Sequence, residues 1–252
     1  MDFAETVQSN YHGTWLEGRW LTILRDYWVV SQGRNILTFN PDPQKNADLL
    51  RNIFQAPLGE LFDFIEFLLQ HLSTPWGLRH ALQKALVDGR SAYRILDGRT
   101  IAAVGSGEQA AAIVTAIDQA VGAAPAAATH IVNAGAELRR GNWPASVRES
   151  IHAVESIAVQ LTGKGTLGDA LNVLERRGHL HGSLKAAFAK LYGYTSDEEG
   201  VRHALVFNDD ALVDESDALF MLGACASFVS YLLAKGHAGG LFAEGATASK
   251  AE

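Results

Sequence analysis

The chain has 252 residues, a formal net charge of -7 at pH 7, and a composition that is 48% hydrophobic and 19% charged. These proportions exclude an intrinsically disordered chain, because enough apolar surface is available to bury a core. The acidic balance argues against a broad, non-specific nucleic-acid surface, which needs clustered lysine and arginine. The length suits two modest domains better than one large domain.

The single cysteine, the N-terminal residues and the lengths of the apolar runs predict the cellular compartment. Cys225 has no partner for an intramolecular disulfide, and the apolar run from Phe220 to Phe228 around it predicts a buried thiol in a reducing compartment. The first residues lack the basic and apolar regions of a signal peptide. No run approaches the ~18–20 consecutive apolar residues of a transmembrane helix. We therefore expect a soluble cytoplasmic protein with no membrane association.

The first 90 residues are predicted to be helical. Residues 1–45 mix aromatic side chains with the breaker run Asn40–Pro43 and give no clear pattern. From residue 46, apolar residues recur at helical spacing, and Pro57 and Gly59 interrupt them, which predicts two helices joined by a short turn. A third helix is predicted over 76–87, with Pro75 at its start.

A β-hairpin is predicted next. Residues 91–96 and 99–104 have strand-like patterns, and Asp97-Gly98 between them suits a type I′ turn with positive φ angles. A helix over 106–121 is expected to return to the N-terminal bundle.

The alanine-rich segment 122–128 lacks bulky side chains and is interpreted as a linker. Beyond it, helices are predicted over 130–140, 143–161, 166–176, 183–191, 197–206 and 214–233. The fold class is therefore mainly α, with an N-terminal helical domain that contains a small β-hairpin and a C-terminal helical bundle. The predicted boundaries are 1–124 for the first domain, with the hairpin at 91–104, 125–236 for the bundle, and 237–252 for a flexible tail.

Two glycine-containing segments resemble nucleotide-binding loops but lack their context. Gly105 and Gly107 follow a strand and open a helix, yet no second parallel strand ends in an acid ~20 residues later. Ser106 as a helix N-cap explains this segment better. Residues 163–166 have Gly165 where a phosphate loop needs Ser or Thr after its lysine. We expect no dinucleotide or other cofactor.

Two other patterns are also set aside. His179 and His181 have no nearby cysteine and no third ligand, so no metal site is predicted. Residues 77–82 and 200–205 share a six-residue pattern, but their flanks differ, and a true repeat extends over ~20–50 residues.

A polar strip on the helix predicted over 143–161 is the first candidate site. Arg148 and His152 are four residues apart and share a helix face, and Glu155 follows three residues later. A second polar cluster contains Arg202 and His203, downstream of acids that suit a helix N-terminus capped by Thr195 or Ser196. Capping explains the acids but not the Arg-His pair.

Several stretches resemble the AbiJ-like abortive-infection proteins of bacterial phage defence. The C-terminal likeness is to their helical HEPN-like region, and the N-terminal likeness is to the associated AbiJ-type domain. The stretch from Leu191 to Asp197, Leu-Tyr-Gly-Tyr-Thr-Ser-Asp, is the most specific part. The matching stretches are 148–156, 184–197, 200–204 and 220–232 in the second half, and 82–86 and 89–98 in the first.

The resemblance implies a helical bundle that dimerises and, in many HEPN domains, cleaves RNA without metal. The usual signature is an Arg, a polar residue directly after it, and a His four to six residues further along. Here Arg202 is followed by His203, but Asn208 stands where that His is expected, and Asn cannot titrate. Arg148 and His152 are also one residue closer together than the signature spacing.

The candidate catalytic residues are therefore Arg202, His203, Arg148 and His152 jointly, and the candidate RNA-binding residues are Arg148, Arg202 and Tyr194. In such a site His moves a proton and Arg neutralises the phosphate. Two hypotheses stay open: a phage-defence protein that binds and cleaves RNA without metal, and a non-catalytic module that binds a nucleotide, RNA or protein and dimerises. The expected partners are RNA or a nucleotide, a second copy of the chain through the C-terminal bundle, and a protein that contacts the N-terminal domain.

Overall fold

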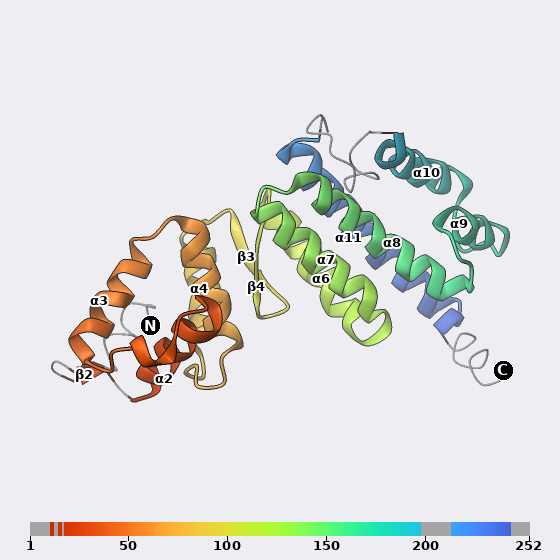
Figure 1. Cartoon of the computed structure of the whole chain (residues 1–252). Helices are drawn as coiled ribbons and strands as arrows, with labels where there is room; N and C mark the ends of the chain where they lie inside the picture. The colour runs from red at the N-terminus through yellow and green to blue at the C-terminus, as the bar shows by residue number, and fades with distance from the viewer. Residues whose placement is uncertain (1–10, 13–14, 17, 198–212, 243–252) are drawn as a thin grey trace. The chain divides into compact units, whose positions relative to one another are not determined.

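The computed structural model describes residues 11–12, 15–16, 18–197 and 213–242. Within them the chain is mainly helical, with ten α-helices and two short antiparallel hairpins. The chain divides into two compact units, Met1–Ile101 and Ala102–Glu252. Both units are shown in Figure 1.

The first unit is built from short helices around an aromatic core. Trp20, Phe64 and Leu68 are fully buried, and the Tyr27 ring meets the Phe64 ring edge to face at 4.8 Å between centroids. This geometry is the one that aromatic pairs prefer. In chain order, the elements are β1 (Tyr11–His12), β2 (Trp15–Leu16), α2 (Gly18–Asp26), a π-helix (Tyr27–Ser31), a 3-10 helix (Ile36–Thr38), α3 (Pro43–Phe54), α4 (Leu58–Gln70), α5 (Leu78–Asp88) and β3 (Tyr93–Leu96).

The predicted hairpin is confirmed. Strands β3 and β4 (Thr100–Ala103) pair, and Asp97 and Gly98 between them have φ angles of 49° and 74°. The helices predicted around residues 46–54 and 61–69 are α3 and α4. The third helix begins at Leu78 rather than residue 76, because Gly77 adopts a left-handed conformation with φ of 94°.

The second unit is a helical bundle centred on its last helix. Helix α11 packs against α6, α7 and α8, and these four run side by side in Figure 1. Helix α9 packs on α8, and α10 contacts both. The elements are α6 (Gly107–Ala123), α7 (Pro125–Arg139), α8 (Trp143–Thr162), α9 (Leu167–Arg176), α10 (Gly182–Asp197) and α11 (Glu215–Ala238).

The boundary between the units lies before α6, not at the expected position 124. Helix α6 packs on α7 and α11, so it belongs to the C-terminal bundle rather than to the N-terminal domain. The expected linker 122–128 is instead the end of α6 and the start of α7, with Pro125 in the first turn. Its small side chains let helices approach closely, and Ala127 and Ala128 are buried.

Two further boundaries differ from the prediction. Helix α10 continues to Asp197, so the backbone of Thr195 and Ser196 lies inside it, whereas both were expected before a separate helix. The helix expected over 197–206 lies, apart from Asp197, outside the described residues. Of the tail expected over 237–252, only residues 237–242 are described, and they are ordered. Helix α11 runs to Ala238, and Leu241 is buried after it.

Helix α11 is the one helix in the described residues that is long and apolar enough to cross a membrane by length and composition, with a window hydropathy of 1.7. Counting consecutive apolar residues missed it, because serines interrupt the run. Half of that window is buried inside the structure, which is compatible with the central helix of a soluble bundle.

Cys225 lies on the buried face of α11, as predicted, and burial raises the pKa of its thiol to about 12.

Candidate functional site

Helix α8 carries the first candidate residues on its outer side. Its inner side buries the stripe that periodicity predicted, Val147, Ile151, Val154, Ala158 and Leu161. Arg148 and His152 lie beside this stripe and are partly exposed. Amphipathic packing of α8 therefore positions both side chains one helical turn apart at the surface of the bundle.

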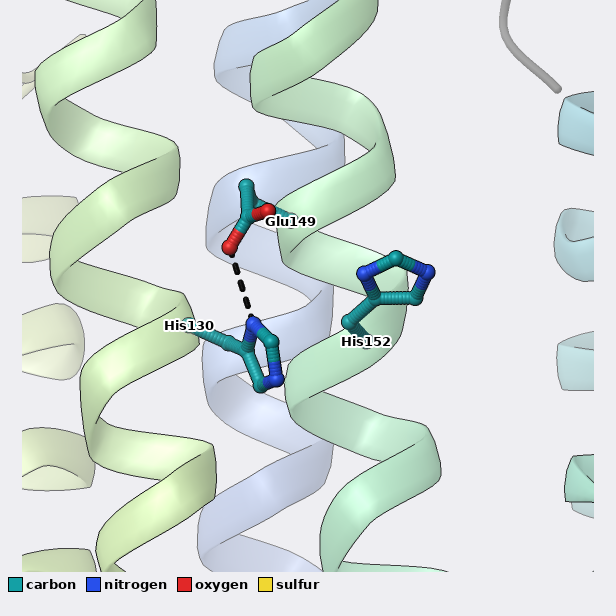
Figure 2. A group of neighbouring side chains, drawn as sticks. All are labelled: His130, Glu149 and His152. Carbon is teal, nitrogen blue, oxygen red and sulfur yellow. Dashed lines mark hydrogen bonds and ion pairs between the residues drawn. The ribbon is translucent and has the colours of Figure 1, made fainter. Parts of the chain in front are cut away.

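A cluster of three ionisable side chains joins α8 to α7. Figure 2 shows His130 of α7 meeting Glu149 of α8, with 2.8 Å between His130 Nδ1 and Glu149 Oε2. The His152 ring lies beside them, with its centroid 5.4 Å from that of His130 and the planes at 65°. One potential ligand atom from each of the three residues lies within 4.8 Å of the others. We call these three residues the His-Glu-His cluster.

Hydrogen bonds and partial burial orient the Glu149 carboxylate. Asn133 Nδ2, one turn after His130, donates to the same Oε2 atom at 3.3 Å. The side chains of His130 and Glu149 are 31% and 24% exposed, so the cluster is half-buried but open to solvent. A carboxylate that accepts from one imidazole nitrogen fixes the ring orientation and leaves the other nitrogen free to act.

The carboxylate expected in the strip, Glu155, is used differently. Its Oε1 accepts a hydrogen bond from the backbone N–H of Leu167 at 3.3 Å, at the start of α9. The positive end of a helix dipole attracts a carboxylate at that position. Glu149, which is three residues before His152, takes the place beside the histidine.

Part of the Arg148 side chain is buried. Its Nε atom is buried and has no hydrogen-bond partner within the described part of the chain. A buried polar atom without a partner costs free energy, and such atoms in native structures call for an explanation. A bound anion would supply the missing acceptor.

The other predicted site residues are not placed. Arg202, His203 and Asn208 lie outside the described residues, and Tyr194 lies in α10 with its side chain outside them. The prediction that two Arg/His pairs form one site therefore stays a prediction. Of that set, the structure places Arg148 and His152 on one face of α8.

Sequence reasoning missed His130 and Glu149. A signal for Glu149 exists, since Glu149 and His152 have the i, i+3 spacing that puts a carboxylate and an imidazole together on a helix. His130 is 19 residues from Glu149 and is joined to it by the packing of α7 on α8. No local pattern predicts that contact.

The patterns set aside from the sequence have structural roles. Ser106 caps α6 by accepting from Gln109 N at 3.1 Å, and Gly105 N donates to Gln109 Oε1 at 2.6 Å. His181 Nδ1 accepts from Ser183 N at 3.2 Å, in the first turn of α10. Within the described ranges, the His-Glu-His cluster is the group of side chains spaced to hold a metal ion.

Comparison with known proteins gives no relative. No family model matches the chain, and no curated protein and no solved structure matches it.

Proposed function

We propose that this chain is a cytoplasmic RNA-binding protein of bacterial phage defence, and that its C-terminal helical bundle binds the phosphodiester backbone beside the His-Glu-His cluster. The observation that carries the proposal is the convergence of His130, Glu149 and His152, two of which lie within one turn of Arg148 on α8. The resemblance of residues 148–156 and 184–197 to the HEPN-like region of AbiJ-like proteins supports the biological setting.

Each group has a role suited to RNA. Arg148 supplies the positive charge for a phosphate, and the buried Nε without a partner supports an anionic ligand there. The His130 imidazole, held by Glu149, has a free nitrogen that can contact the ribose 2′-OH or a phosphate oxygen. Arg202, His203 and Tyr194 are proposed to complete the contact surface.

The spacing favours binding over cleavage. Metal-free cleavage requires one group to take the 2′-OH proton and a second group to protonate the leaving 5′-oxygen on the far side of the phosphorus. Ligand atoms of His130 and His152 lie within 4.8 Å of each other, so the two rings face one small volume rather than flanking a phosphate. Cleavage would therefore need a further proton donor, and His203 is the candidate for it.

The test measures RNA binding and RNA cleavage by the full-length protein in EDTA. We expect Arg148→Gln to weaken binding of a single-stranded RNA about tenfold. The slope of the logarithm of the binding constant against the logarithm of the salt concentration should fall in magnitude by about one. The exposed Arg140, which pairs with Glu137, provides the matched control Arg140→Gln. If cleavage occurs, the ends are 2′,3′-cyclic phosphate and 5′-hydroxyl, and His152→Ala and His203→Ala reduce it. Equal RNA affinity in wild type and Arg148→Gln contradicts the proposal.

A non-catalytic interaction module is the second candidate. Large apolar side chains are exposed in both units, with Leu72 and Trp76 at 102% and 101% in the first unit and Phe220 at 58% in the second. Exposed apolar groups of this size suit protein contacts. This candidate predicts a homodimer weakened by Phe220→Ser, which analytical ultracentrifugation would measure, and a protein partner bound through Trp76.

A further inference from the structure

We infer that the His-Glu-His cluster is a binding site for a divalent transition-metal ion, with Zn²⁺ as the best match. Its ligands are one imidazole nitrogen each from His130 and His152 and one carboxylate oxygen from Glu149. The inference does not rest on RNA binding, since it concerns the ion and these three side chains alone.

The donor set matches the chemistry of such ions. Imidazole suits zinc, copper, iron and nickel, whereas Mg²⁺ and Ca²⁺ prefer oxygen ligands. Two histidines and one glutamate are a known set of protein ligands for zinc. In such sites the ion has three protein ligands, and water or substrate takes the fourth position. The single carboxylate leaves a net positive site.

An ion could bind after small changes in the distances between the three ligand atoms. Bonds of about 2.1 Å in a tetrahedral site put ligand atoms roughly 3.4 Å apart. In this structure the three ligand atoms lie within 4.8 Å of one another. His130 Nδ1 and Glu149 Oε2 are already 2.8 Å apart, bridged by a hydrogen that an ion can replace. Rotation of the partly exposed His152 side chain can supply most of the remaining movement.

The scaffold already provides the supporting features of a metal site. Two of the ligands are on one turn of α8, and the third is on α7, which packs tightly against it. Asn133 donates to the Glu149 carboxylate, as outer partners of metal ligands commonly do. The side chains of His130 and Glu149 are 31% and 24% exposed, so an ion can reach the cluster from solvent.

Metal binding and metal-free proton transfer are alternative uses of the same imidazoles. A nitrogen that ligates an ion cannot accept or donate a proton. We therefore expect zinc to inhibit any RNA cleavage that proceeds in EDTA. An anionic phosphate could still bind at the fourth position of the ion.

The test is a titration of the full-length protein with zinc chloride after a chelator has removed bound metal. Isothermal titration calorimetry measures the affinity and the number of ions bound. A parallel titration with cobalt chloride reports the geometry through visible absorption. We expect one ion per chain and the intense bands of a four-coordinate cobalt site. His130→Asn, Glu149→Gln and His152→Asn should each weaken binding by at least tenfold. The exposed His80 of the first unit provides the matched control His80→Asn, which should keep wild-type affinity.

Two results would overturn the inference. One is the absence of saturable zinc binding by the wild type, and the other is unchanged affinity in all three cluster variants. If circular dichroism shows that the variants do not fold, the test is instead whether zinc protects histidines of the wild-type protein from chemical labelling. Zinc should then shield His130 and His152, but not His80, from diethylpyrocarbonate, and equal labelling contradicts the site. Arg148→Gln should keep its zinc binding, so loss of RNA binding alone leaves this inference standing.

Discussion

His130 and Glu149 join two helices of the C-terminal bundle, with His130 Nδ1 2.8 Å from Glu149 Oε2 across the α7–α8 contact. Both side chains are partly exposed, so the pair should contribute a modest part of the stability. A double-mutant cycle with His130→Ala and Glu149→Ala should give a coupling energy of about 0.5–1 kcal/mol in urea unfolding at neutral pH. A coupling near zero would contradict a stabilising role for the pair.

Gln109 should be important for the stability of the second unit. Its Oε1 accepts from Gly105 N at 2.6 Å, and its Nε2 donates to the Leu219 carbonyl of α11 at 2.6 Å. Gln109→Ala leaves both backbone groups without this partner, so we expect a loss of roughly 1–3 kcal/mol in urea unfolding. Gln119→Ala, at an exposed position of the same helix, should change stability by less than about 0.5 kcal/mol. Equal effects of the two substitutions would contradict the bridging role.

Gly98 should be intolerant of a side chain. It has a φ angle of 74°, and a Cβ atom there would lie 2.8 Å from Arg79 Nη1. The arginine can move, but the backbone conformation cannot be relieved without breaking the turn. Gly98→Ala should lower the thermal midpoint and cost more than about 1 kcal/mol. Gly107→Ala, with open space around it in the first turn of α6, should be neutral or stabilising.

Cys225 should be inert in the folded protein. Burial raises the pKa of its thiol to about 12, and the thiolate is the form that reacts. Between pH 7 and pH 9 we expect slow modification by a disulfide reagent, at a rate set by unfolding rather than by thiol ionisation. In urea the same thiol should react rapidly, with a rate that rises with pH. Rapid native-state modification would show that the α11 face is open.

The sequence by itself determined most of the helices and the turn chemistry. Helical periodicity gave the α8 stripe, and Asp97-Gly98 gave the hairpin, because each depends on residues close together in the chain. A local pattern also located the cap of α6 at Ser106.

Tertiary packing decided the unit boundary and the composition of the candidate site. The alanine-rich segment 122–128 lacks the bulky groups that mark a core, yet its small side chains bring helices together. Arg148 and His152 were predictable from their spacing, but His130 comes to Glu149 only because α7 folds back along α8. A contact over 19 residues between two half-buried polar side chains has no periodic signature. The sequence thus determined the polar face of α8, and the three-dimensional packing determined which groups meet there.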